Sequence, residues 1–151
     1  LSDDNFLYRS VDPTTLEFKF VETLLKGVEI QLPEGEFFND HNGHPRKKIR
    51  VRWWEDVSGK TYSDVIFPSS GNGLNETISS DLGNLWAPYN EDEVPIFFGH
   101  YWISPDDLPE PLTKNVACLD YSVASPGGKL TAYRWSAEHE LSADNFFQVS
   151  V

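Results

Sequence analysis

The sequence lacks several residue types, and each absence limits what the chain can be. Its 151 residues include no methionine and one cysteine, Cys118, so an internal disulfide is excluded and a reducing, cytoplasmic setting is expected. No run approaches the roughly 18 consecutive apolar residues of a membrane-spanning helix, and no signal peptide with a basic start and an apolar centre is present. The missing methionine, absent even at position 1, indicates a trimmed chain or a piece of a longer one.

Basic side chains are also scarce. The chain has 12 Lys and Arg against 24 Asp and Glu, a formal net charge of −12, which argues against nucleic acid or an anionic membrane as partner. Apolar bulk is plentiful, with five Trp, six Tyr and ten Phe. We therefore expect residues 1–151 to form a single domain or a fragment of one.

One strong helix is predicted near the start of the chain, over residues 11–27. Leu16, Phe20 and Leu24 recur at every fourth position, which gives the segment one apolar face. Gly27 suits the end of the helix. The pattern predicts an amphipathic helix docked on a core.

Strand patterns dominate the rest of the chain. Residues 28–35 alternate apolar and polar side chains, and residues 36–67 are predicted to form an inserted β-hairpin that turns at Asn42-Gly43. In the returning strand, the apolar residues at every second position from Ile49 are expected to be buried. Residues 60–67 are expected to add a further strand.

The closing third is predicted to be β structure again, after a long irregular connection over 68–93. The apolar segment 94–98 suits a strand buried on both faces. Residues 114–124 and 129–135 suggest a strand–turn–strand unit around "SPGG", and a short strand is expected at the end of the tail. The fold class is therefore predicted as α/β and strand-rich, with a mixed sheet and one main helix.

Gly99-His100, at the end of the apolar segment 94–98, is the main candidate site. Reacting groups in open α/β sheets gather at the carboxyl ends of strands, and a glycine permits close approach or an unusual φ angle. Both features suit a metal-binding or catalytic histidine. The alternative interpretation is an imidazole at the edge of the core, bonded to a carbonyl.

Other polar candidates have simpler explanations. Asp40, His41 and His44 could suggest a metal site, but the Asn-Gly turn already explains them as a solvated hairpin tip. His139 lies in a charged loop and is expected to be exposed. The glycosylation motif at Asn75 is attributed to chance in a cytoplasmic protein.

Tryptophans support a second functional hypothesis. In "RVRWWED", the alternation predicts that Trp53 shares the buried face with Val51 and that Trp54 lies on the basic face. Exposed Trp54, Trp86 and Trp102 could stack on a ligand such as a sugar. The alternative function is thus a non-catalytic, β-rich binding module that uses exposed aromatic residues.

Four segments in order carry a family resemblance: "LLKGVEIQLPEG", "RKKIRVRWW", "PIFFGHYW" and "NVACLDYSVASPGGKLTAYRW". They resemble the C-terminal half of calcineurin-like metallophosphoesterases, in the bacterial branch related to serine/threonine protein phosphatases and diadenosine tetraphosphatases. The resemblance covers most of the chain from about residue 20 onward, apart from 68–93.

This resemblance implies two divalent metal ions, of the Mn, Fe or Zn type, that bridge a hydroxide attacking a phosphate ester substrate. It also implies that His100 is one metal ligand. The residue after the family's Gly-His is usually Thr, whereas here it is Tyr101.

The family's early motifs, Gly-Asp-x-His, Gly-Asp-x-x-Asp-Arg-Gly and Gly-Asn-His-Glu, do not occur in this sequence. A single imidazole cannot hold two cations. We therefore expect the C-terminal portion of a phosphatase, inactive alone, whose partner is the missing N-terminal half of the same domain.

Overall fold

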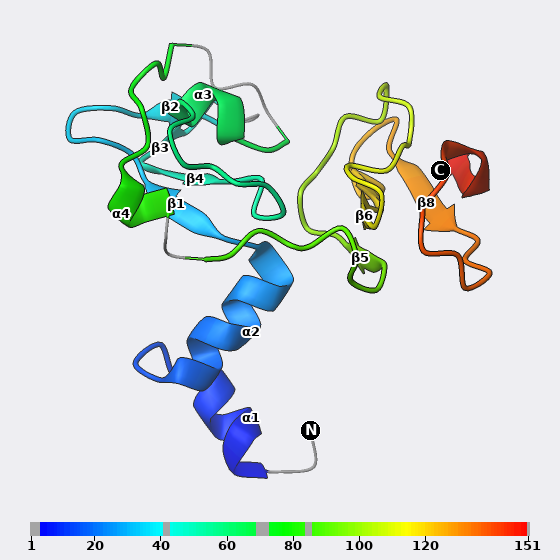
Figure 1. Ribbon diagram of the computed structural model, residues 1–151, viewed down its shortest axis with the longest axis horizontal. Helices are drawn as coiled ribbons and strands as arrows, with labels where there is room; N and C mark the ends of the chain where they lie inside the picture. Colours follow the sequence, from blue (N-terminus) through cyan, green and yellow to red (C-terminus); the bar gives the residue numbers. More distant parts are fainter. Residues whose placement is uncertain (1–3, 41–42, 69–72, 84–85, 151) are drawn as a thin grey trace.

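The computed structural model describes residues 4–40, 43–68, 73–83 and 86–150, and these form three parts (Figure 1). We call them the arm (4–27), the hairpin lobe (28–83) and the sheet lobe (94–150), and residues 86–93 lead into the sheet lobe. The fold is mixed α/β and rich in short strands, as predicted. No helix in the described part of the chain is long and apolar enough to cross a membrane.

The arm consists of α1 (Asp4–Ser10) and α2 (Leu16–Lys26). Helix α2 begins after Thr15, whose hydroxyl accepts a hydrogen bond from the Phe18 N–H at 3.2 Å. It ends at Gly27, where φ is 76° and the N–H donates to the Thr23 carbonyl at 2.8 Å. The predicted helix and its terminal glycine are thus confirmed, with a later start.

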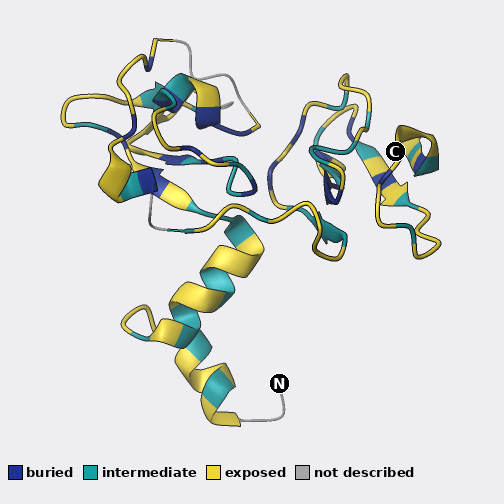
Figure 2. Ribbon diagram, viewed as in Figure 1, coloured by how far each residue is buried: buried dark blue, intermediate teal, exposed yellow. Residues whose placement is uncertain are grey.

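The predicted docking of this helix on a core is wrong. None of the residues of α2 is buried, and Leu16, Phe20 and Leu24 are 76%, 57% and 62% exposed. Figure 2 shows the arm without buried residues along its described length. The apolar stripe exists as predicted, but no described element lies over it.

The hairpin lobe contains two short antiparallel ladders. Strand β1 (Glu29–Gln31) pairs with β4 (Lys48–Arg50), and β2 (Phe38–Asn39) pairs with β3 (Pro45–Arg46). The predicted hairpin is confirmed in these pairings, and Gly43 has a φ of 77° near its tip. Of the predicted turn, Asn42 lies outside the described residues.

Residues 62–65 form a helical turn between isolated β-bridges at Thr61 and Ile66, so the continuous strand predicted over 60–67 is wrong. Helix α3 (Tyr62–Val65) begins at Thr61, whose hydroxyl accepts from the Asp64 N–H at 3.3 Å. The Asp64 carboxylate in turn accepts from the Thr61 N–H at 3.0 Å. This reciprocal cap satisfies the first N–H groups of a helix and outweighs the apolar alternation.

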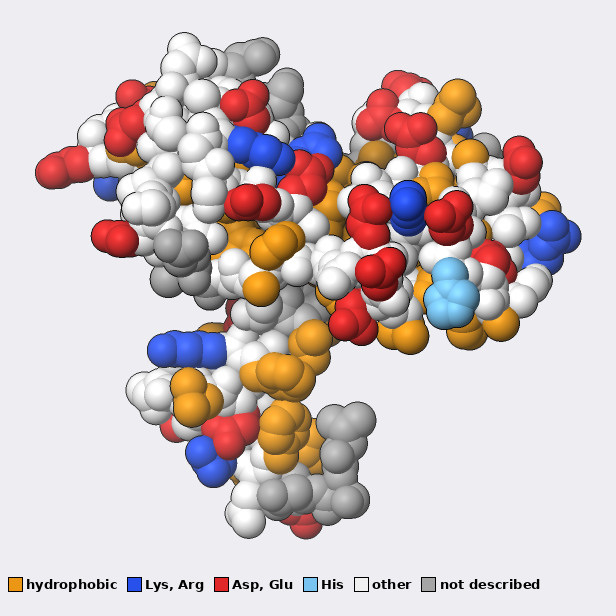
Figure 3. Space-filling view, viewed as in Figure 1, with side chains coloured by type: hydrophobic (Ala, Val, Ile, Leu, Met, Phe, Trp, Pro, Cys, Tyr) orange, Lys and Arg blue, Asp and Glu red, His pale blue; other side chains and the backbone are white. Residues whose placement is uncertain are grey.

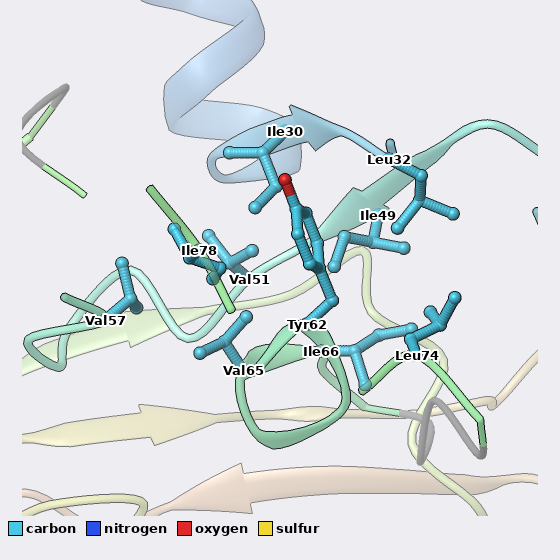
Figure 4. Packing of buried hydrophobic residues seen from close by; sticks show 10 residues of the cluster. All are labelled: Ile30, Leu32, Ile49, Val51, Val57, Tyr62, Val65, Ile66, Leu74 and Ile78. Atoms are coloured by element: carbon cyan, nitrogen blue, oxygen red, sulfur yellow. The ribbon is translucent and has the colours of Figure 1, made fainter. Parts of the chain in front are cut away.

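The hairpin lobe contains a hydrophobic core, whose members are mostly aliphatic (Figure 4). Leu74 and Ile78 belong to it, so this part of the predicted irregular connection is packed there, and the connection also contains α4 (Ser80–Gly83). The buried members of this core are Ile30, Leu32, Ile49, Val51, Val57, Tyr62, Val65, Ile66, Leu74 and Ile78.

The sheet lobe follows the predicted strand order. Its elements are β5 (Ile96–Phe98), β6 (Val116–Cys118), β7 (Asp120–Tyr121), β8 (Lys129–Tyr133), the 3₁₀ helix η1 (Ala143–Asn145) and β9 (Phe146–Ser150). Strands β5 and β6 are parallel, and β7, β8 and β9 are antiparallel. Strand β5 is only half-buried and pairs with β6 alone among the described strands, so the expected burial on both faces is wrong.

Both faces of the β8–β9 ladder carry apolar side chains. Leu130 is opposite Val149 and Ala132 is opposite Phe147, so these four share one face, and all four are exposed. The other face packs Phe146 into the interior. An antiparallel sheet that meets water on one side normally presents polar residues there, which makes this face unusual.

Candidate functional site

His100 lies in a tight turn that leaves the carboxyl end of β5, which we call the His100 turn (residues 99–102). His100 and Trp102 have φ angles of 72° and 55°. Such left-handed backbone is uncommon for residues other than glycine and persists where surrounding contacts stabilise it. Two side chains from other strands supply those contacts.

The first is Asp120, at the start of β7. Its Oδ2 accepts hydrogen bonds from the N–H groups of Tyr101 and Trp102, at 3.0 and 3.2 Å. Its Oδ1 accepts from the Ser122 N–H at 3.1 Å. This carboxylate therefore organises the backbone of the turn. Asp120 was not predicted as a site residue, because its partners lie 18 and 19 residues earlier in the chain.

The second is Arg50, from β4 of the hairpin lobe. Its Nη1 donates a hydrogen bond to the His100 carbonyl. Its guanidinium carbon lies 5.4 Å from the centroid of the Tyr101 ring. The hairpin lobe thus contacts the His100 turn directly, a role for Arg50 that was not predicted.

Tyr101 anchors the turn in an aromatic seam between the two lobes, formed by Trp54, Phe67, Phe98 and Tyr101. Its ring centroid lies 4.9 Å from that of Phe98 and 5.3 Å from that of Phe67. Burial raises the pKa of the Tyr101 phenol to about 12. A side chain at Gly27 would overlap the Tyr101 hydroxyl, so the end of the arm also packs on this turn.

The His100 side chain itself is exposed. Within the described residues, its imidazole makes no hydrogen bond or ion pair, whereas its carbonyl is held by Arg50. The interpretation as an imidazole bonded at the core edge therefore does not describe this structure. An exposed, unengaged imidazole on a fixed turn is suited to binding a ligand or a metal ion.

Metal-binding residues do not gather into a complete site in the described part of the chain, where no three His, Cys, Asp or Glu side chains are grouped. The other candidates lie elsewhere. Asp40 Oδ2 lies 2.8 Å from Arg46 Nη2, and Asp40 Oδ1 lies 3.6 Å from His44 Nδ1. His41 lies outside the described residues. His139 is exposed, as predicted.

The predicted orientation of the Trp53–Trp54 pair is wrong, because Trp54 is the buried member. It is 2% exposed and packs on Phe67, whereas Trp53 is half-buried. The alternation fails because the strand ends at Arg50 and the chain turns, with the Trp53 N–H donating to the Val51 carbonyl at 2.8 Å.

The remaining tryptophan candidates differ from each other. Trp86 is half-buried against the core of the hairpin lobe. Trp102 is 45% exposed, next to His100 in the turn. Trp102 is therefore the most exposed of the three aromatic residues that the binding-module hypothesis proposed.

Comparison with known proteins adds no relationship: no family model, curated protein or solved structure matches the chain.

Proposed function

We propose that this chain is the C-terminal portion of a dinuclear-metal phosphatase and contributes His100 as one metal ligand. The observation that carries the proposal is the position of His100. Its exposed imidazole stands at the carboxyl end of a strand that is parallel to its neighbour, on a turn fixed by Asp120 and Arg50. This is where sheet-based active sites collect their functional groups.

Exposed apolar surfaces support the proposal that this chain is one portion of a larger domain. The stripe of α2 and the outer face of β8–β9 both present large apolar side chains to solvent. Figure 3 shows hydrophobic side chains along the side of the arm that faces the sheet lobe. Surfaces of this kind normally mark sites that another layer of structure covers. In this proposal that layer is the N-terminal half of the same domain.

The described residues do not by themselves fit a two-metal centre, because the described chain offers no group of three ligands. We therefore assign no catalytic step to this chain. The metal ions would supply a bound hydroxide and charge neutralisation at the phosphate. The chain's own part is to hold the His100 imidazole in place.

The proposal is tested by reading the coding sequence upstream of Leu1 and producing the extended protein. We expect the aspartate- and histidine-bearing motifs there, and hydrolysis of an aryl phosphate with Mn²⁺. His100→Ala should lower turnover by about 100-fold or more, since even residues that support metal ligands change activity by about 10- to 100-fold.

His139→Ala is the matched control, because His139 is another exposed histidine of the sheet lobe. It should leave turnover unchanged. An upstream sequence without those motifs, or full activity in His100→Ala, contradicts the proposal. The 151-residue chain alone should show no turnover.

A non-catalytic binding module is the second candidate, favoured by the exposure of Trp102. It predicts that Trp102→Ala abolishes binding of an aromatic-stacking ligand such as an oligosaccharide, and that His100→Ala does not. Binding of oligosaccharides to the 151-residue chain, followed by tryptophan fluorescence, distinguishes it from the phosphatase.

A further inference from the structure

Two arginines of the hairpin lobe, Arg50 and Arg52, lie over neighbouring aromatic rings beside the His100 turn. Arg50 ends β4 and Arg52 follows two residues later, and the side chains of Ile49 and Val51 are in the core. They belong to a basic segment in a chain of net charge −12. That segment holds five of the 12 Lys and Arg residues: Arg46, Lys47, Lys48, Arg50 and Arg52.

Both guanidinium groups are stacked on aromatic rings. The guanidinium carbon of Arg50 is 5.4 Å from the Tyr101 ring centroid, and that of Arg52 is 5.5 Å from the Phe67 ring centroid. The two rings are themselves neighbours, with centroids 5.3 Å apart. Stacking limits the freedom of each side chain, so less conformational entropy is lost when an anion binds.

Neighbouring carboxylates offset this charge only in part. Arg50 Nε lies 3.5 Å from Glu29 Oε1, and Arg52 Nη1 lies 3.6 Å from Glu55 Oε1. Both distances are longer than the N–O distance of a close charged hydrogen bond, which is about 2.7–2.9 Å. The two arginine side chains are 24% and 36% exposed, so solvent and solutes reach them. The two guanidinium groups are like charges held over neighbouring rings, and a bound anion would lower the repulsion between them.

We propose that Arg50 and Arg52 form a binding site for a phosphate oxyanion, as found in a phosphate monoester or a diphosphate. The planar guanidinium matches phosphate oxygens in a bidentate manner. Because Arg50 also bonds the His100 carbonyl, the bound phosphate would lie beside the His100 turn. Its role as substrate recognition rests on the proposed function, whereas the anion site itself does not.

The test is a titration of the ¹⁵N-labelled 151-residue chain, followed by NMR at constant ionic strength. The probes are inorganic phosphate, phenyl phosphate and pyrophosphate. We expect saturable shifts of the Arg50 and Arg52 side-chain N–H groups and of the backbone of the His100 turn. Tighter binding of pyrophosphate assigns a diphosphate ligand, and equal binding of phosphate and phenyl phosphate assigns a monoester.

Variants make the test specific. The double variant Arg50→Gln/Arg52→Gln should weaken binding by about tenfold or more, because each lost charged contact has a large effect on affinity. Arg134→Gln is the matched control, since Arg134 also stacks on an aromatic ring, 5.4 Å from the Phe147 centroid. It should bind the probes like the wild type.

Arg52→Lys keeps the charge but loses the planar fork, and it leaves the Arg50 contact with the turn in place. It should fold normally and bind several-fold more weakly. Shifts that do not saturate, or equal weakening by Arg134→Gln, overturn the proposal. His100→Ala should keep phosphate binding, so failure of the metal-ligand proposal and failure of the anion site give different results.

Discussion

The hairpin lobe and the arm both carry periodic apolar patterns, yet they bury them to opposite degrees. In the hairpin lobe, Ile49 and Val51 alternate with basic residues and are almost fully buried. In the arm, Leu16, Phe20 and Leu24 follow helical spacing and are more than half exposed. Periodicity therefore identified the apolar face in both regions, but only the hairpin lobe contains the elements that cover it.

The sheet lobe lies between these extremes. Its aromatic seam packs against the hairpin lobe, where Trp54 contacts Phe98 and Phe67 contacts Tyr101. Its β8–β9 ladder leaves an apolar face in solvent. The molecule is thus well packed where its two lobes meet and open along the arm and the far sheet, and the following predictions test this contrast.

The largest effect is expected in the seam. Trp54→Ala should lower the free energy of unfolding by about 3–5 kcal/mol, because it removes a buried aromatic side chain and leaves a cavity. Trp102→Ala, in the exposed part of the same region, should cost less than about 1 kcal/mol. Urea denaturation followed by circular dichroism measures both, and equal losses would contradict the assigned burial.

The contrast between lobe and arm is tested by two aliphatic truncations. Ile49→Ala should cost about 2–5 kcal/mol, since Ile49 is in the core of the hairpin lobe. Leu24→Ala should change stability by about 0.5 kcal/mol or less, because its side chain is mostly in water. A large loss in Leu24→Ala in the isolated chain would mean that the arm is docked after all.

Gly27 joins the arm to the seam and should tolerate no side chain. Gly27→Ala should cost about 1–3 kcal/mol, because φ is 76° and the added methyl group overlaps the Tyr101 hydroxyl. Tyr101→Phe removes that hydroxyl. The double variant should therefore lose less stability than the sum of the single variants, and strict additivity in this cycle would exclude the contact.

A smaller effect is expected from pH. The pKa of Tyr101 is raised from 10.0 to about 12 in the folded chain, so its contribution to stability is complete below pH 10 and is lost as the pH rises toward 12. Stability measured from pH 9 to 12 should fall less steeply in Tyr101→Phe than in wild type. Tyr8→Phe, an exposed control on the arm, should keep the wild-type slope.

Local signals predicted those features that depend on adjacent residues. The end of α2 at Gly27, the strand before Gly99-His100 and the turn between β7 and β8 were all predicted and are confirmed. The strand predicted over 60–67 failed because a competing local interaction was missed. Thr61 and Asp64 form a reciprocal cap that makes residues 62–65 helical.

Features that depend on distant residues could not be predicted from spacing. Asp120 and Arg50 reach the His100 turn from other strands, and nothing in their own neighbourhoods indicates that contact. Likewise, the spacing of Leu16 and Phe20 requires a covering surface but does not say where it comes from. The exposed state of His100 was likewise decided by tertiary contacts.

Metal content tests the central claim most directly, because it does not depend on the choice of substrate. The protein extended through the coding sequence upstream of Leu1 is loaded with Mn²⁺, desalted and analysed by elemental mass spectrometry. We predict about two Mn²⁺ ions per chain for the wild type and for His139→Ala, and a clear loss of bound metal in His100→Ala. Undiminished metal content in His100→Ala would contradict the assignment of this imidazole as a ligand.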